Sequence, residues 1–408
     1  MDYYGERMAK NDIDEFLESA AAFLVANAHP IQQRGGWGVG DDYLSAYRSM
    51  TAEEEGERVR AARWWKALEF DAGFGWISGP PELGGRGLPP QFERSYLELR
   101  SGYDVPAQNV FAISLGMVAP SFEQFGSDAV RALVPQLWRG DLIGCQLFSE
   151  PTNGSDVAGL ITRAVQDGDE WVIDGQKVWT SVAQHSEWGL LLARSDPSVP
   201  KHAGITAFAL DMSAPGVDVR PLVMMTGGTE FNEVFLDGVR VADTHRLGPV
   251  NGGWKVAIAT LMNERALGAA GNDLFGTFRA LERLRMTIER VGASADRRVR
   301  AEYARLHAMG ETIRYMALAA DERRRLGMPP GPAESVFKLA NTETLRGITV
   351  LASRLCGPAA VADTGEWGMY AWGMLEATMP GLRIAGGTDE IMRNILAERV
   401  LGLPKEPG

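Results

Sequence analysis

The chain has 408 residues, of which 45% are hydrophobic and 23% are charged, and its formal net charge is -12. This balance is typical of a folded protein with more than one domain, whereas an acidic chain lacks the basic surface that non-specific nucleic-acid binding requires. Two cysteines exclude a disulfide framework or a cysteine-rich metal site, and the five histidines show no metal-ligand spacing.

Nothing at the amino terminus or along the chain indicates a membrane segment. Residues 1–10 are polar and acidic, unlike a signal peptide. No run of about eighteen apolar residues is present, which a membrane-spanning helix would require. We therefore expect a cytosolic protein.

Residues 1–140 are predicted to form an all-helical domain. Apolar residues recur at helical spacing over Asp14–Asn27, and similar patterns return over Ala52–Glu69, Gln91–Gly102 and Ala107–Met117. Loops rich in glycine and proline, such as 78–90, separate these segments.

Residues 141–250 change to short strand patterns. The stretch Trp171–Trp179 predicts two short strands around an Asp-Gly turn. Further strands are predicted at Leu190–Ala193, Ile205–Leu210, Val217–Val219 and Glu233–Phe235. Because no helical pattern intervenes, we expect an antiparallel barrel or sandwich.

Residues 251–408 are predicted to be helical again. A long helix is expected over Trp254–Val291, followed by helices over Arg300–Gly327, Ala333–Leu355 and Glu390–Leu401. Long helices with short links predict an antiparallel four-helix bundle. The expected fold is therefore α+β and multidomain: a helical domain, a β domain and a helical bundle.

Two polar stretches lie where the helical region meets the β region, a kind of junction that ligands favour. One covers residues 146–156, and the other ends a strand with Trp179, Thr180 and Ser181. An indole beside hydroxyl groups can stack on a planar ring and hydrogen-bond its edge. An ordinary turn and an ordinary buried tryptophan explain the same residues, and the residues alone favour these simpler interpretations.

One face of the helix predicted after Gly252 holds a single carboxylate, Glu264, among apolar and small residues. The positions on this face are spaced alternately four and three residues apart. They are Ala257, Leu261, Glu264, Gly268, Gly271 and Phe275. Burial without a partner would raise the pKa of Glu264, as a general base near neutral pH requires. A structural ion pair with an arginine of a neighbouring helix explains the position equally well.

A turn near the carboxyl end combines two helix-breaking glycines with a helix-start residue. Gly386 and Gly387 end any preceding helix, and Thr388 is typical of a helix N-cap. The backbone N–H groups at such a start can bind an anion or a polarised carbonyl. A plain interhelical turn fits equally well.

Taken together, these stretches resemble the acyl-CoA dehydrogenase family. Residues 149–156 resemble its Thr/Ser-Glu-Pro-x-x-Gly-Ser-Asp signature, and Lys177–Ser181 resembles its Lys-x-Trp-Ile-Thr segment. Asn251–Trp254 resembles its Gly-x-Gly-aromatic helix start, and Gly386–Thr388 resembles its Glu/Gly-Gly-Thr turn. The resemblance covers nearly the whole chain and includes the family's order of domains.

The resemblance implies FAD bound between the β domain and the carboxyl-terminal bundle. Ser155 matches a position that contacts the ligand near the flavin, and Thr388 and Glu390 match positions near the adenosine part. The positions that match the family's flavin-side residues are Gln146, Phe148, Ser149, Trp179, Thr180 and Ser181.

The resemblance also implies a catalytic base, which many members carry at the position of Gly386. A minority, resembling isovaleryl-CoA and long-chain enzymes, carry it on the long helix, where this chain has Glu264. Arg265 matches an arginine that helps to place the base or the ligand. By this resemblance, the Gly386 N–H polarises the thioester carbonyl, Glu264 removes the α proton, and the β hydrogen passes to flavin as hydride. The product is a trans-2-enoyl-CoA, and an electron-transfer flavoprotein receives the electrons.

Two departures resemble a bacterial subgroup that acts on bulky substrates, steroid side chains among them. Many members have an Arg-x-x-Phe-Gly stretch that reaches the FAD pyrophosphate, and this chain has the arginine-rich Glu289–Arg298 in its place. Where the family usually has a Gly-Gly pair in a later loop near the FAD adenosine, this chain has Cys-Gly-Pro-Ala at Cys356–Ala359. Some members of that subgroup form α2β2 tetramers. The sequence therefore leaves three oligomeric states as alternatives: a homotetramer, a homodimer and an α2β2 heterotetramer. It also leaves two alternative functions, a non-catalytic subunit of such a tetramer and a flavin monooxygenase on the same fold.

Overall fold

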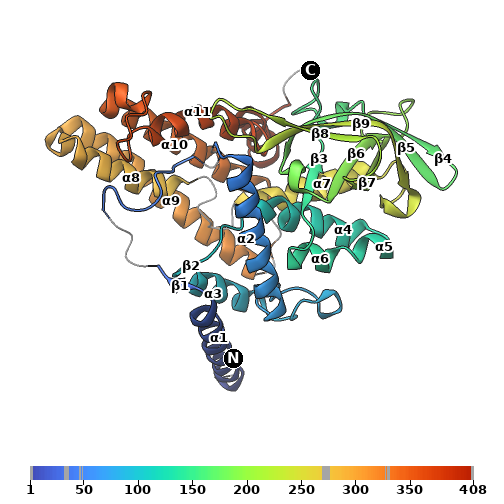
Figure 1. The fold of residues 1–408 in the computed structure, drawn as a ribbon, viewed down its shortest axis with the longest axis horizontal. Coiled ribbons are helices and arrows are strands. Elements are labelled where there is room, and N and C mark those ends of the chain that lie inside the picture. The colour runs from blue at the N-terminus through green and yellow to red at the C-terminus, as the bar shows by residue number, and fades with distance from the viewer. Residues whose placement is uncertain are drawn as a thin grey trace.

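The computed structural model describes residues 3–31, 36–45, 47, 49–268, 276–326, 328 and 331–405. Helices come first, a large sheet follows, and helices return at the carboxyl end. Figure 1 shows the sheet at one end of the molecule and the carboxyl-terminal helices at the other, with α2 (Ala52–Asp71) between them. The predicted fold class is confirmed.

The amino-terminal helices surround two cores. Besides α2 they are α1 (Tyr3–Asn27), α3 (Pro90–Arg100), α4 (Ala119–Phe125), α5 (Asp128–Arg131) and α6 (Val134–Arg139). The strands β1 (His29–Pro30) and β2 (Tyr103–Asp104) pair antiparallel. One core lies among α1, α2 and α3, whereas α4 and α6 pack against the sheet.

The main sheet has eight strands in the order β10-β7-β6-β4-β5-β9-β8, with β3 pairing beside β6. Its strands are β3 (Gly144–Leu147), β4 (Arg163–Asp167), β5 (Glu170–Ser181), β6 (Trp188–Arg194), β7 (Ile205–Asp211), β8 (Val217–Leu222), β9 (Phe231–Ala242) and β10 (Arg246–Leu247). Leu190 and Leu192 of β6 face the core shared with the helices, and Leu191 and Ala193 face a core within the sheet itself. Burial on both faces explains why β6 is an unbroken apolar run.

Three local predictions were wrong. Asp174-Gly175 is not a hairpin turn: β5 is one strand, and its pairing with β9 shifts register there, as at a β-bulge. The sheet is not wholly antiparallel, because β3 and β4 both run parallel to β6. The helix expected over Trp254–Val291 is not continuous, since α8 begins at Thr277, directly after Gly276, whose φ of 74° is left-handed.

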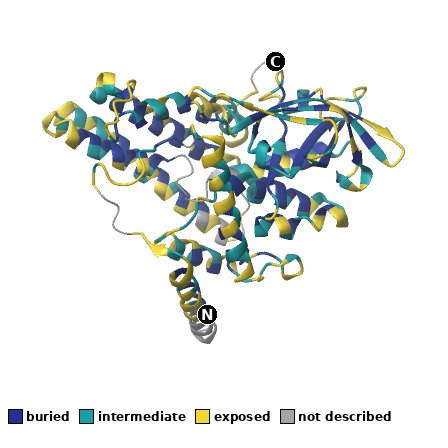
Figure 2. Ribbon diagram, viewed as in Figure 1, coloured by how far each residue is buried: buried dark blue, intermediate teal, exposed yellow. Residues whose placement is uncertain are grey.

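The carboxyl-terminal helices pack around α10 (Ser335–Cys356). The others are α7 (Gly253–Gly268), α8 (Thr277–Arg290), α9 (Arg297–Arg325), α11 (Ala371–Ile384) and α12 (Asp389–Ile395). Figure 2 shows buried residues along the inward sides of these helices and in the inner strands. Leu345, Ile348 and Leu351 of α10 supply the centre of this core.

A long connection between β1 and α2 crosses the bundle, and we call its described residues between 36 and 50 the strap. Leu44 is buried in the bundle core, and the Ser45 hydroxyl lies 2.5 Å from that of Thr378 on α11. Asp42 accepts a hydrogen bond from Arg283 of α8 at 2.7 Å. In Figure 1 the strap is the blue trace that reaches the bundle before returning to α2.

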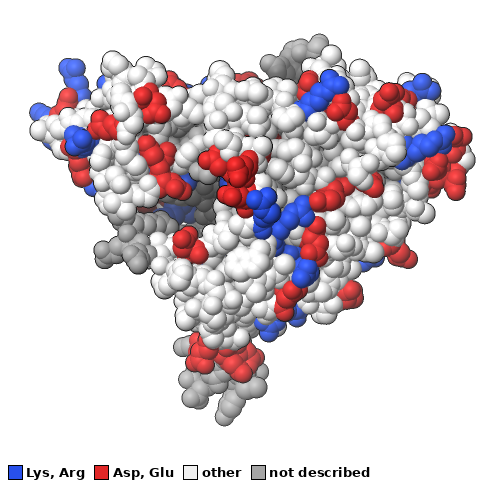
Figure 3. Space-filling view, viewed as in Figure 1, with Lys and Arg blue, Asp and Glu red and all other residues white. Residues whose placement is uncertain are grey.

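The surface carries charges of both signs. Figure 3 shows acidic and basic side chains interspersed over the face in view. In the described part of the chain, no helix has both the length and the apolar character needed to cross a membrane.

Candidate active site

The segment that follows β3 lies beside the end of β5. The backbone N–H of Val178 donates to the Ser149 carbonyl at 2.9 Å, and the Lys177 ammonium donates to the Phe148 carbonyl at 3.2 Å. Gln146 is partly buried in β3, directly before this segment. These bonds hold Phe148 and Ser149 beside the end of β5, with Gln146 before them in the chain and Trp179 directly after Val178.

The end of β5 has an irregular backbone that turns an indole outward. Trp179 and Val182 adopt left-handed φ values of 59° and 54°, a conformation that costs non-glycine residues about 1–3 kcal/mol and is often found at functional sites. Trp179 is 60% exposed. Thr180 is buried, and its hydroxyl has no hydrogen-bond partner among the described residues, whereas Ser181 is partly buried.

A buried ion pair, which no pattern in the sequence predicted, fixes both segments. Glu150 and Lys177 are both buried and lie 2.8 Å apart. The Glu150 carboxylate also accepts the backbone N–H groups of Ile161 and Thr162, at 2.6 and 2.9 Å. Burial alone would raise the pKa of Glu150, but Lys177 and these hydrogen bonds outweigh it and hold the pKa below its usual value. The pair therefore joins the loop after β3 to β5 in one geometry.

Helix α7 connects the sheet to the carboxyl-terminal turn. A Cβ atom at Gly253 would lie within 2.9 Å of the β7 backbone, so only glycine allows the helix to begin this close to the strand. The backbone N–H of Asn251 donates to the Thr206 hydroxyl of β7 at 2.9 Å, which fixes the same junction.

Glu264, on α7, lies against the Gly386 turn. A Cβ atom at residue 386 would stand 3.4 Å from Oε1 of Glu264. Glu264, predicted to lie on the buried face of this helix, is partly buried. The side chain of Arg265, and the stripe positions Gly271 and Phe275, lie outside the described residues.

The turn between α11 and α12 has the predicted character. Gly386 and Gly387 have φ values of 67° and 91°, and Thr388 caps α12 by accepting the Ile391 N–H at 3.2 Å. Glu390 is exposed on the first turn of α12, 3.9 Å from Arg393.

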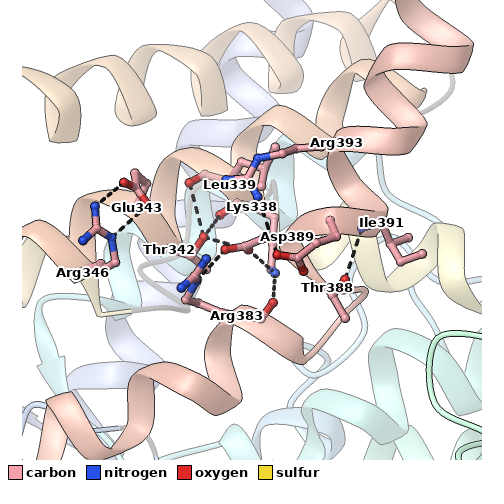
Figure 4. Close-up of polar contacts among 11 residues, drawn as sticks. Lys338, Leu339, Thr342, Glu343, Arg346, Arg383, Thr388, Asp389, Ile391 and Arg393 are labelled. Carbon is pink, nitrogen blue, oxygen red and sulfur yellow. Dashed lines mark hydrogen bonds and ion pairs between the residues drawn. The ribbon is translucent and has the colours of Figure 1, made fainter. Parts of the chain in front are cut away.

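A polar cluster lies directly behind this turn, and it too was missed from the sequence. Figure 4 shows Lys338 and Thr342 of α10 and Arg383 of α11 converging on Asp389. Lys338 donates to Asp389 Oδ1 at 2.7 Å, Arg383 donates to Oδ2 at 2.7 Å, and Thr342 lies 3.1 Å from Oδ1. Burial would raise the pKa of Asp389, but these donors outweigh it and lower the pKa.

The predicted site residues thus fall into two groups joined by α7. One group lies at the ends of β3 and β5, and the other consists of Glu264, Gly386, Thr388 and Glu390. Ser155 is exposed, in the loop that follows Glu150. A separate depression between α4 and β10, lined by Phe125, Asp243 and Arg246 among others, contains none of the predicted residues.

The first group suits a flat heterocyclic ligand with polar edges. An exposed indole offers a stacking surface, and the buried Thr180 hydroxyl beside it retains an unused hydrogen-bonding capacity. Both features fit the isoalloxazine of a flavin.

Comparison with known proteins gives consistent matches. The model for the middle domain of acyl-CoA dehydrogenases matches residues 145–239, and the model for their C-terminal domain matches residues 251–401. The chain is 36% identical over 355 residues to acyl-CoA dehydrogenase IpdE1 of Mycobacterium tuberculosis, covering 86% of this chain and 90% of the relative.

Two solved structures are similar over most of the chain. The Tcur3481-Tcur3483 steroid ACAD has a TM-score of 0.75 and 25% identity, covering 97% of this chain and 98% of that chain. A chain of the ChsE4-ChsE5 complex from Mycobacterium tuberculosis has a TM-score of 0.68 and 27% identity, covering 88% and 99% respectively.

Proposed function

Because the chain belongs to the acyl-CoA dehydrogenase family and is an oxidoreductase that acts on acyl-CoA, we propose that Glu264 is its catalytic base. The reaction removes one hydrogen from the α carbon and one from the β carbon of the thioester. A base is needed for the α hydrogen, which leaves as a proton.

The observation that carries the proposal is the proximity of the Glu264 carboxylate to the Gly386 turn. A thioester carbonyl that accepts the Gly386 N–H would gain negative charge on oxygen in the transition state, which acidifies the α carbon. The Glu264 carboxylate lies next to that turn, with 3.4 Å between its Oε1 and the Cβ position of residue 386. Donor and base can therefore act on the thioester carbonyl and on the α carbon next to it, and no carboxylate on residue 386 is needed. We assign Arg265 to placing the base or the ligand.

We further propose that FAD is the cofactor of this chain. FAD, when bound, supplies the acceptor for the β hydrogen as hydride. Trp179 would stack on the flavin ring, with Thr180 and Ser181 at its edge and the residues after β3 beside it. The remaining assigned contacts are Gln146, Phe148, Ser149 and Ser155 near the flavin, and Thr388 and Glu390 near the adenosine part.

We propose a bulky acyl group as substrate and an oligomer as the working form. Support for the first comes from the solved structure described as a steroid ACAD, which aligns with 97% of this chain. Support for the second comes from the ChsE4-ChsE5 complex, which contains two different chains. An electron-transfer flavoprotein is the proposed electron acceptor.

The test is reduction of bound FAD by a panel of acyl-CoA thioesters, with straight-chain, branched and ring-containing acyl groups. The wild-type chain is purified alone, its FAD content is measured, and bleaching of the flavin absorbance is followed. Glu264→Gln should bind FAD and thioester normally yet lose at least about a hundredfold in the rate of bleaching, as removal of a general base does.

Two outcomes would contradict the proposal. A Glu264→Gln variant that bleaches at the wild-type rate would show that another group removes the proton. A wild-type chain that holds FAD but is bleached by no thioester would favour a non-catalytic subunit.

A further inference from the structure

The two glycines of the Gly386 turn leave its backbone without a conformational preference of its own. Gly386 and Gly387 both lie at left-handed φ, and glycine visits both signs of φ at similar free energy. Contacts from outside the turn must therefore hold Gly386 in place beside Glu264.

One side chain joins both ends of this turn. The Lys338 ammonium donates to the backbone carbonyl of Arg383 in the last turn of α11, at 2.7 Å, and to Asp389 Oδ1 in the first turn of α12, also at 2.7 Å. These two acceptors bracket the residues from 384 to 388, so the Lys338 side chain spans the turn from behind, as Figure 4 shows.

The folding stability of the protein does not by itself require an ion pair at the position of Lys338 and Asp389. The side chains of Lys338 and Asp389 are 11% and 2% exposed. Burying a charged pair costs desolvation, and well-packed apolar residues are often as stable or more stable in its place. Thr388 already caps α12 without help from Lys338. The directional bonds of Lys338 instead fix geometry.

We propose that Lys338 is a positioning residue that holds the Gly386 turn against Glu264 by tying the end of α11 to the start of α12. This inference rests on the proposed function, in which the Gly386 N–H and Glu264 act on one acyl group. Lys338 itself touches neither the substrate nor the cofactor in this assignment, and it acts through Arg383 and Asp389.

The test compares Lys338→Met with Arg346→Gln. Arg346 lies on the same helix, is about half exposed, and pairs with Glu343, so it controls for loss of a cation from α10. The first measurement is hydrogen–deuterium exchange of the peptide that contains residues 385–388, without substrate. Exchange should rise at least about tenfold in Lys338→Met, because local opening of the turn becomes easier, and should be unchanged in Arg346→Gln.

The second measurement is flavin reduction at increasing acyl-CoA. Lys338→Met should lower the maximal rate at least about tenfold, since small misplacements of reacting groups cost this much or more. The half-saturating acyl-CoA concentration and the FAD content should stay within about twofold of wild type, because Lys338 contacts neither ligand and ground-state binding is unchanged. Lys338→Arg, which retains a cationic donor, should recover part of the rate.

The inference is wrong if Lys338→Met is reduced at the wild-type maximal rate, or if exchange over residues 385–388 does not change. Should Lys338→Met fail to fold, Thr342→Val removes another contact to the same carboxylate with little change of shape. It should then give a severalfold loss of maximal rate, and an unchanged rate would overturn the inference. Failure of the proposed function is distinct, because wild type and Arg346→Gln would then also fail to bleach while the exchange difference remained.

Discussion

The carboxylate of Glu264 lies 3.4 Å from the Cβ position of Gly386, although 122 positions separate the two residues in the chain. The contact joins α7, which begins on the sheet, to the turn that closes the bundle. An acidic side chain reaches the turn from α7, and the turn itself contributes only backbone. Because the base is a side chain and the donor is a backbone group, substitutions can test the two separately.

Gly386→Ala should slow the reaction more than it destabilises the fold. At a φ of 67° a Cβ atom is strained, and it would stand 3.4 Å from Glu264 Oε1. Strain at left-handed φ costs about 1–2 kcal/mol, and displacement of the turn should lower flavin reduction about tenfold. Gly292→Ala is the matched control, because Gly292 has a φ of 71° and nothing within 4 Å of its Cβ position. Equal rates in the two variants would contradict the assigned role of the turn.

Trp179→Ala should weaken FAD binding and leave the stability of the apoprotein nearly unchanged. Trp179 is 60% exposed, so little packing is lost, whereas loss of ring stacking costs about 0.5–1.5 kcal/mol, or up to about tenfold in affinity. Trp64→Ala is the control, because Trp64 is 57% exposed and lies on α2. Titration of the apoprotein with FAD measures both. If Trp64→Ala weakens binding as much as Trp179→Ala, the stacking assignment fails.

Lys177→Met should unfold the region around β5 and release FAD. It leaves the buried Glu150 carboxylate without its cation, which typically costs about 3–5 kcal/mol. Adding Glu150→Gln should restore part of this loss, because the second substitution removes the uncompensated charge. Lys201→Met provides the contrast: its pair with Asp156 is about half exposed, and its loss should cost less than about 1 kcal/mol. Urea unfolding and FAD content are the measurements, and equal losses in the two lysine variants would contradict the prediction.

Asp389 should make the fold sensitive to acid. Its pKa in the folded chain lies below the ordinary value of 3.8, so the unfolded chain takes up the proton first as the pH falls. Its contribution is therefore complete above about pH 5 and is lost as the pH falls through the lowered pKa. Asp389→Asn should be less stable at neutral pH, yet its free energy of unfolding should fall less steeply between about pH 5 and pH 2. The exposed Asp104→Asn should follow wild type, and parallel curves for Asp389→Asn and wild type would refute the assignment.

Periodicity and local motifs predicted much of the fold but not its irregularities. The continuous apolar runs of β6 and β7 and the helix start at Thr388 were recognisable, because each is encoded by adjacent residues. Asp174-Gly175 was misread, since the same dipeptide suits a hairpin turn and a bulge. The break at Gly276 was missed because a glycine inside a helical pattern is often tolerated.

The site was predictable where it follows a local signature and unpredictable where it depends on pairing across the chain. Glu264 and Gly386 were selected from their own neighbourhoods. The buried pairs Glu150–Lys177 and Lys338–Asp389 join residues 27 and 51 positions apart, and single-sequence patterns carry no information on such pairing. The strap lacks periodicity, so its attachment to the bundle left no signal.

The strap determines how the protein behaves after proteolysis or truncation. It passes from the first helical region onto the bundle, where Leu44 enters the core and Asp42 pairs with Arg283. Its next residues approach the sheet, since Tyr47 packs on Phe231 with ring centroids 5.2 Å apart. A protease cut within the strap should therefore leave two fragments that co-purify, and the bundle expressed without residues 36–50 should expose apolar surface and aggregate.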